Sequence, residues 1–196
     1  MRITQSILPL FRARGHGCIG FTSSSTAWAA LPFMAHYAAS KAALSAFVDG
    51  LHKEVRPHGI QCLSFECGGF PTHLGQPRDA GDGGFGAVGP TIAAYQPLFG
   101  ELVAMFASDP MAYMPGDLAK AAARIVDVIK REGLAAGKPW AVRVAIGSDG
   151  FLTAKQRCEE QLVLLNTWKD LSCSTDREGQ SVGSEEMSKF TSVLEF

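Results

Sequence analysis

Short, uniformly apolar segments alternate with longer amphipathic ones along the chain. Three segments are short and apolar throughout, as expected for strands buried on both faces of a sheet, and they cover residues 18–22, 60–65 and 140–146. Apolar residues recur at helical spacing elsewhere, which predicts helices over residues 3–14, 35–55, 92–106, 117–129 and 153–168. Helices that alternate with short apolar strands predict an α/β fold with a parallel sheet of about three strands.

Two further segments depart from this alternation. The segment Gly68–Gly89 carries eight of the 21 glycines, a density typical of a mobile lid, so we expect residues 75–90 to cover a binding site. Beyond Leu171 the composition shifts to Ser, Thr, Glu and Gly, which favours disorder. The sequence therefore predicts one domain over residues 1–171 and a mostly disordered tail over residues 172–196.

Charge and hydrophobicity narrow the classes of partner. The chain has 18 Lys and Arg against 19 Asp and Glu, so neither a nucleic acid nor an anionic membrane is an expected partner. Hydrophobic residues make up 46% of the 196 residues, enough for a buried core, but no apolar run is long enough to span a bilayer. We expect a globular protein of the cytoplasm.

The cysteines fit this location. They are odd in number and include no C-x-x-C pair, so we predict neither a metal site nor a disulfide framework. We expect buried thiols that stay reduced in the cytosol at all five positions, Cys18, Cys62, Cys67, Cys158 and Cys173.

One tyrosine and one lysine carry the chemistry that the sequence indicates. Tyr37 and Lys41 lie four residues apart in a predicted helix, so their side chains share one face. A nearby ammonium favours the ionised phenol, which lets Tyr37 exchange protons near neutral pH. Ser24 lies 13 residues before Tyr37, just beyond the first predicted strand, and residues 68–72 lie at the matching end of the second. Because α/β folds bind ligands at this edge of the sheet, these residues predict an acid/base site.

In their order along the chain, these motifs resemble those of the short-chain dehydrogenase/reductase family. The resemblance covers roughly residues 2–176 and rests on the segments TQSILPLFRARG, GCIGFTSSS, YAASK, ECGGFPT and GSDG and on the helix after Asp117. The segment TWKDLSCSTD is similar to the corresponding segment in a branch of this family that is common among fungal reductases. The resemblance implies a Rossmann-like doubly wound parallel sheet, of which this chain would carry the C-terminal half.

The same resemblance implies roles for individual residues. Tyr37 would be the general acid/base, and Lys41 would assist its ionisation and contact the ribose of a cofactor. Ser24 would orient the substrate carbonyl, with Ser23 or Ser25 as register alternatives.

The dinucleotide site of the family is only partly represented. If a dinucleotide binds, Thr72 would contact its carboxamide and Gly68 would adjoin it, but the family's first half, with its glycine-rich turn and acidic ribose-binding residue, would precede Met1. Two G-x-G-x-x-G strings occur at residues 15–20 and 81–86. A genuine fingerprint follows a strand and opens a helix, whereas the first string follows a predicted helix and the second lies in the glycine-rich loop. We interpret both as chance matches.

Three functions stay open. We favour a cofactor-independent enzyme of secondary metabolism, in which Ser24, Tyr37 and Lys41 activate a carbonyl or enone for isomerisation, dehydration or cyclisation. The first alternative is an NAD(P)-dependent carbonyl or alcohol oxidoreductase whose nucleotide-binding half is missing or supplied by another chain. The second is a non-catalytic partner subunit. For an enzyme, we expect a medium-sized apolar carbonyl compound as substrate.

The strand at residues 18–22 would form the edge of the shortened sheet, with unpaired N–H and C=O groups. Such an edge invites pairing with another chain. We therefore predict a homodimer or a higher homo-oligomer, most simply a twofold dimer through the helices at residues 2–14 and 35–55.

Overall fold

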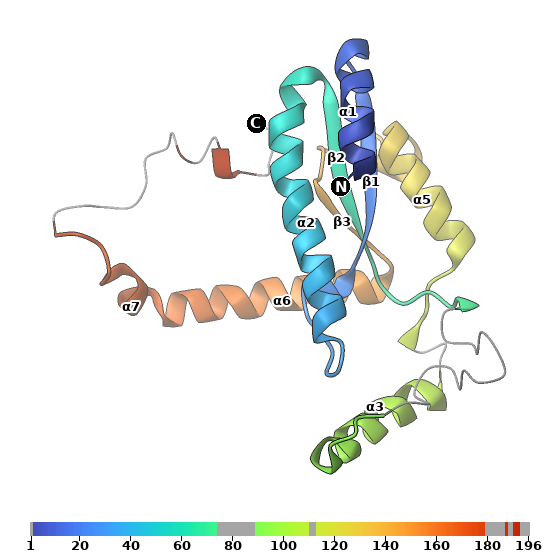
Figure 1. The fold of residues 1–196 in the computed structure, drawn as a ribbon, viewed down its shortest axis with the longest axis vertical. Coiled ribbons are helices and arrows are strands. Elements are labelled where there is room, and N and C mark those ends of the chain that lie inside the picture. The colour runs from blue at the N-terminus through green and yellow to red at the C-terminus, as the bar shows by residue number, and fades with distance from the viewer. Residues whose placement is uncertain (1, 74–88, 110–112, 179–186, 188–189, 193–196) are drawn as a thin grey trace.

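The sheet in the computed structural model has three parallel strands, as predicted from the sequence (Figure 1). The structure describes residues 2–73, 89–109, 113–178, 187 and 190–192. β1 (Gly17–Ser24) and β2 (Ile60–Cys67) pair along their whole lengths, and β3 (Arg143–Ile146) pairs with Ser64–Cys67 of β2. The strand order β1-β2-β3 aligns the carboxyl ends of all three strands at one edge of the sheet.

Helices cover both faces of this sheet, which confirms the predicted fold class (Figure 1). α1 (Arg2–Arg14) and α2 (Ala35–Val55) lie on one face, and α5 (Leu118–Lys130) lies on the other. Alternation along β1 separates the two faces, because Phe21 meets Phe47 of α2 whereas its neighbour Gly20 faces Ile129 of α5. The remaining helices are α3 (Gln96–Ser108), α6 (Ser148–Thr167) and α7 (Lys169–Cys173). Short 3-10 turns cover Ser25–Ala27, Arg56–His58, Ala93–Tyr95 and Gly133–Ala135.

The core lies between β2 and its neighbours. β2 has a strand on either side and a helical layer on each face, so its side chains are the most completely buried. The buried apolar side chains come from α2, β2 and the segment around β3, and they are Val48, Leu51, Val55, Ile60, Cys62, Leu63, Phe65, Trp140, Val142 and Ile146. On its outer edge, β1 has no partner strand among the described residues.

Some predicted boundaries are confirmed and others are wrong. α2 has the predicted bounds, and Asp117 caps α5 as predicted, since its Oδ1 accepts a hydrogen bond of 2.9 Å from the N–H of Lys120. β3 begins at Arg143 and not at residue 140, because Trp140 and Val142 are buried without belonging to the strand. α6 begins at Ser148 and not at residue 153, because Gly147, with φ of 100°, turns the chain directly from β3 into the helix.

Two predicted segments fall mostly outside the described residues. Of the predicted lid, residues 75–88 are not described, so the prediction is untested. α7 ends at Cys173, just beyond the predicted domain boundary at residue 171, and most of the predicted tail after residue 178 is not described. Within the described part of the chain, none of the helices has the length and apolar character that crossing a membrane requires.

All five cysteines are free thiols, but the prediction that all are buried is wrong. Cys62 is buried, Cys18 and Cys67 are half-buried, and Cys158 and Cys173 are exposed on α6 and α7. Burial, and to a lesser degree the neighbouring Cys18, raises the pKa of Cys62 to about 12, so its reactive thiolate is scarce at neutral pH.

We expect iodoacetamide to modify Cys158 and Cys173 in the native protein and Cys62 only after unfolding. Peptide mapping by mass spectrometry tests this, and native labelling of Cys62 as fast as that of Cys158 would contradict it.

Candidate active site

Ser24, Tyr37 and Lys41 all lie at the carboxyl-terminal edge of the sheet. Ser24 ends β1, and α2 begins at Ala35 after the connecting loop, so Tyr37 lies in the first turn of α2 and Lys41 one turn later. Ser24 is buried, with 7% of its surface exposed, whereas 44% of Tyr37 is exposed. The fold therefore brings the three predicted residues to the edge where α/β folds bind ligands.

The hydroxyl of Ser24 is held by Thr26. Its Oγ accepts hydrogen bonds from the N–H of Thr26 at 3.2 Å and from the hydroxyl of Thr26 at 3.0 Å, as the cap of the turn Ser25–Ala27. Both contacts use acceptor positions of the oxygen. The hydroxyl hydrogen of Ser24 therefore remains available for donation to a ligand oxygen.

The two register alternatives to Ser24 lie in different environments. Ser23 points to the α2 face of the sheet and is 3% exposed, with its Oγ 2.9 Å from the Oγ of Ser45 and 3.3 Å from the main-chain oxygen of Lys41. Ser25 opens the 3-10 turn and lines a cavity. Ser24 thus combines a place at the strand end with a fixed hydroxyl.

Lys41 extends along the open edge of β1. Its Nζ donates a hydrogen bond of 3.0 Å to the main-chain oxygen of Thr22 and lies 5.7 Å from the centroid of the Tyr37 ring. The structure therefore supports the predicted proximity of the ammonium and the phenol. Anchoring by Thr22 also restricts the flexible lysine side chain, so that its charge has a fixed place beside Tyr37.

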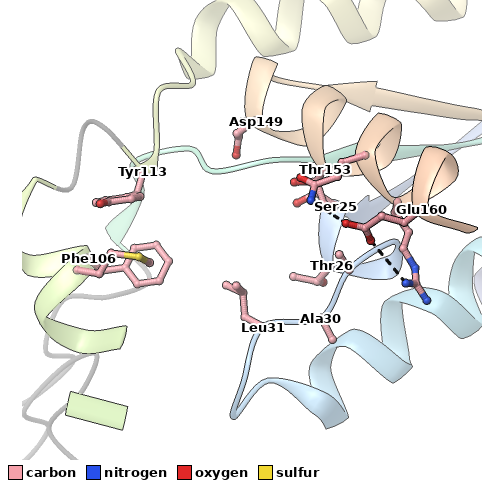
Figure 2. A pocket seen from close by; sticks show the side chains of 13 residues that line it. Ser25, Thr26, Ala30, Leu31, Phe106, Tyr113, Asp149, Thr153 and Glu160 are labelled. Atoms are coloured by element: carbon pink, nitrogen blue, oxygen red, sulfur yellow. Dashed lines mark hydrogen bonds and ion pairs between the residues drawn. The ribbon is translucent and has the colours of Figure 1, made fainter. Parts of the chain in front are cut away.

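A cavity of about 470 Å³ lies next to this group (Figure 2). One wall is polar and comes from α6, and the facing wall is apolar and includes the edge-to-face pair Phe106 and Tyr113, whose ring centroids are 5.7 Å apart. Ser25 and Thr26 line the end nearest to Ser24. Neither Tyr37 nor Lys41 lines this cavity. Its volume is typical of small-molecule sites.

Asp149 links the cavity to the end of β2. Its Oδ2 accepts a hydrogen bond of 2.5 Å from the N–H of Gly69, while its Oδ1 is buried and has no hydrogen-bond partner among the described residues. A buried carboxylate oxygen without a hydrogen-bond partner carries a desolvation cost. We did not predict this residue as part of a site, although it belongs to the GSDG motif at residues 147–150.

The predicted cofactor contacts lie on the segment after β2. Gly68 donates its N–H to the main-chain oxygen of Ile146 at 2.8 Å, so this group extends the sheet. Thr72 is exposed a few residues farther on. The glycine string at residues 15–20 runs from α1 into β1, as predicted, and the string at residues 81–86 lies outside the described residues.

Gly68 is also required by its contact with Asp149. A Cβ at this position would overlap both carboxylate oxygens of Asp149. We expect Gly68→Ala to lower the free energy of unfolding by about 1–3 kcal/mol, because the Asp149 carboxylate must move and its hydrogen bond from Gly69 is disturbed. Gly50 in α2 provides the control, because a Cβ there meets nothing within 4 Å and alanine should stabilise the helix by about 0.5–1 kcal/mol. Urea denaturation measures both, and equal stability of the two variants would contradict the assignment.

Comparisons with known proteins agree with this geometry. The short chain dehydrogenase family profile matches residues 1–83. The NADPH-dependent 1-acyldihydroxyacetone phosphate reductase of Saccharomyces cerevisiae is 34% identical over 68 residues, which cover 35% of this chain and 23% of that protein.

A solved structure extends the similarity to most of the fold. The short-chain dehydrogenase from Streptomyces avermitilis is 30% identical and superposes with a TM-score of 0.70 over 89% of this chain and 58% of that one. The chain therefore spans less than two thirds of the length of either protein. The matched motifs, the parallel sheet and these similarities together support membership of the chain in the short-chain dehydrogenase/reductase family.

Proposed function

We propose that the chain supplies the acid/base site of an NAD(P)-dependent oxidoreductase that interconverts a carbonyl and an alcohol. The observation that carries the proposal is the fixed ammonium of Lys41 beside the Tyr37 ring, at the sheet edge that also presents Ser24. The relatives support this choice of chemistry, since they are named as a dehydrogenase and as an NADPH-dependent reductase.

Each of the three side chains has a distinct part in carbonyl reduction. Tyr37 donates the proton of its hydroxyl to the carbonyl oxygen, and Ser24 donates a hydrogen bond to the same oxygen. Lys41 stabilises the negative charge that the phenol oxygen acquires. When bound, the reduced nicotinamide supplies the hydride for the carbonyl carbon, so that hydride and proton together yield the alcohol.

The donors at this edge fit the nicotinamide and ribose end of a dinucleotide. Lys41 and Tyr37 offer an ammonium and a hydroxyl to ribose hydroxyls, and the exposed Thr72 offers a hydroxyl to the carboxamide. A pyrophosphate is usually held by backbone N–H groups where a strand turns into a helix. The glycine string at residues 15–20 runs from a helix into a strand, which is the reverse of this order, so it does not fit a pyrophosphate.

The cofactor-independent reaction predicted from the sequence uses the same three side chains. The comparisons do not support our preference for it over hydride transfer, because they point to NAD(P). Isomerisation, dehydration or cyclisation of a carbonyl compound thus becomes the second candidate, carried by the available hydroxyl of Ser24, which can activate a carbonyl without a nucleotide.

The cavity suits the predicted substrate class. Its apolar wall, with Leu31, Met105 and Phe106, suits a medium-sized apolar carbonyl compound, and its polar wall suits additional hydroxyl or amine groups. A role in secondary metabolism, a homo-oligomeric state and a cytoplasmic location are further parts of this proposal.

The test measures turnover with and without nucleotide. The protein is incubated with a panel of apolar aldehydes and ketones plus NADPH or NADH, and nucleotide absorbance and product alcohols are followed. A parallel series without nucleotide is analysed by mass spectrometry for isomers and dehydration products. We expect alcohols only with nucleotide. Products formed at the same rate without nucleotide would replace the proposal with the second candidate, and no product in either series would favour a non-catalytic subunit.

A further inference from the structure

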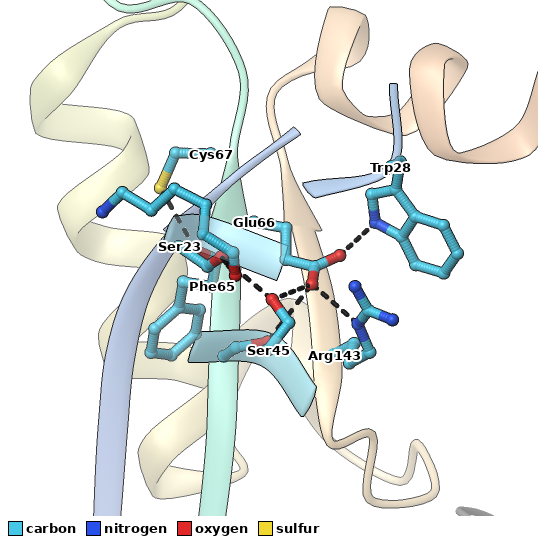
Figure 3. A network of polar contacts seen from close by, with 9 residues as sticks. Ser23, Trp28, Ser45, Phe65, Glu66, Cys67 and Arg143 are labelled. Carbon is cyan, nitrogen blue, oxygen red and sulfur yellow. Dashed lines mark hydrogen bonds and ion pairs between the residues drawn. The ribbon is translucent and has the colours of Figure 1, made fainter. Parts of the chain in front are cut away.

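A buried carboxylate lies on the α2 face of the sheet, near the carboxyl end of β2 (Figure 3). Glu66 is the penultimate residue of β2, and only 1% of it is exposed. Donors from four elements surround it: Ser45 Oγ at 2.8 Å, Arg143 Nε at 2.7 Å, Ser64 Oγ at 3.4 Å and the indole N–H of Trp28. A carboxylate only accepts hydrogen bonds, so all four groups donate to it.

This requirement fixes the direction of a chain of hydrogen bonds. Ser45 gives its single hydroxyl hydrogen to Glu66, so the contact of 2.9 Å between Ser45 and Ser23 has Ser23 as donor, and Ser23 shares its one hydrogen between Ser45 and the main-chain oxygen of Lys41 at 3.3 Å. The network therefore runs from Ser23 at the end of β1, through Ser45 on α2, to Glu66 on β2. A charged acceptor at its end strengthens each bond along the chain.

The network holds the elements that carry the site. Tyr37, Lys41 and Ser45 follow one another at intervals of four residues on α2, so they share one helical face and the Ser45 bond fixes the rotation of that face. Ser23 precedes Ser24, and successive residues of a strand point to opposite faces, so anchoring Ser23 also sets the direction of Ser24.

Glu66 is also connected to Ser24 through Trp28 and the turn that follows β1. Trp28 follows the turn Ser25–Ala27, and its indole is held by Glu66 and covered by the Arg143 guanidinium, which lies 4.1 Å from the ring centroid. The same turn carries Thr26, which donates two hydrogen bonds to Ser24. Glu66 therefore restrains both the turn that fixes the Ser24 hydroxyl and the helix that carries Tyr37.

We propose that Glu66 is a positioning residue of this site, which sets the distance between the hydroxyl of Ser24 and the Tyr37–Lys41 face of α2. The inference rests on the proposed function, since it assigns Glu66 a part in that chemistry. It does not make Glu66 a catalytic residue, because the carboxylate is buried and reaches the site only through other side chains. Rates depend steeply on such placement, and a shift of about 1 Å can lower them about 100-fold.

Two buried serines provide a matched pair for the test. Ser45 and Ser64 are both fully buried and both donate to the same oxygen of Glu66, but Ser45 lies on α2 whereas Ser64 lies on β2 and joins no other element to the carboxylate. We expect Ser45→Ala to lower kcat about tenfold, with KM changed less than about twofold, and Ser64→Ala to leave both constants within about twofold of the wild type. Both variants should lose similar amounts of thermal stability.

A spectroscopic measurement makes the test independent of turnover. The chain has three tyrosines, Tyr37, Tyr95 and Tyr113, so 3-fluorotyrosine gives three 19F resonances, and Tyr37→Phe identifies one of them. We expect Ser45→Ala, but not Ser64→Ala, to shift the Tyr37 resonance. If Ser45→Ala does not fold, Trp28→Phe, which breaks the connection through Trp28, should lower kcat and shift the Tyr37 resonance in the same way.

The outcomes separate this inference from the proposed function. Equal changes in kcat and in the Tyr37 resonance for Ser45→Ala and Ser64→Ala would overturn the positioning role. A wild-type protein without turnover would remove the proposed function, while the 19F comparison would still decide whether Glu66 controls the placement of Tyr37.

Discussion

Replacement of Tyr37 by phenylalanine is expected to lower kcat about 1,000-fold, the effect typical of removing a general acid. The substitution deletes only the phenol oxygen, which carries the proton in the proposed reaction. The ring keeps its place near the ammonium of Lys41, and 44% of the residue is exposed, so the fold should be unaffected. KM should change less than about threefold, because substrate contacts other than the phenol oxygen remain.

Tyr95 supplies the matched control for this measurement. It is 52% exposed in the 3-10 turn Ala93–Tyr95, away from the sheet edge, and Tyr95→Phe also deletes a single phenol oxygen. We expect its kcat to stay within about twofold of the wild type, since surface substitutions have small effects. Steady-state kinetics and thermal melting of both variants decide the matter. If Tyr37→Phe keeps more than a tenth of the wild-type kcat, Tyr37 is not the proton donor.

The parts of this site that could be predicted from the sequence are local ones. Tyr37 and Lys41 share a helical face because of their spacing alone, and α2 has its predicted bounds because an Ala- and Leu-rich segment is terminated at Pro57. The parallel sheet followed from three apolar segments separated by helices. For the helix the deciding interactions lie within a few turns of chain, and for the sheet the alternation of strands and helices along the chain was sufficient.

The parts that could not be predicted depend on contacts between distant segments. Glu66 meets Arg143 from 77 residues away, and Asp149 meets Gly69 from 80 residues away. No spacing rule connects such pairs, because their proximity results from the packing of β3 and α6 against β2. An acidic residue within a buried strand was the available signal for Glu66, since a buried charge requires partners. It indicates that partners exist without indicating which residues they are.

The pairing of Glu66 with Arg143 leads to the second large effect, on stability. Arg143→Met is expected to lower the free energy of unfolding by about 3 kcal/mol, the lower end of what breaking a buried ion pair costs. Glu66 is 1% exposed and Arg143 26% exposed, so the carboxylate would remain in the interior without the cation that faces it at 2.7 Å. Methionine keeps much of the apolar stem, so the expected loss reflects charge more than volume.

Asp49 gives this loss a dependence on pH. Burial raises the pKa of Asp49, the Arg143 charge partly lowers it, Glu66 raises it and Lys53 lowers it. Without Arg143 the pKa of Asp49 rises further in the folded state, so the folded variant binds a proton more readily than the unfolded chain. Stability increases as pH falls wherever the folded state binds more protons. The deficit of Arg143→Met should therefore narrow as the pH is lowered from neutral toward the ordinary range of aspartate.

Urea denaturation at several pH values tests both parts of this prediction. Lys155→Met is the control, because it removes an exposed pair with Glu159 at 3.5 Å and should cost less than about 1 kcal/mol at every pH. The double variant Glu66→Gln/Arg143→Met removes both charges, so it should lose less stability than the sum of the two single variants. Strictly additive losses would mean that the two side chains act independently. In that case the carboxylate would be held by its neutral donors, and the ion pair would not be what keeps Glu66 in place.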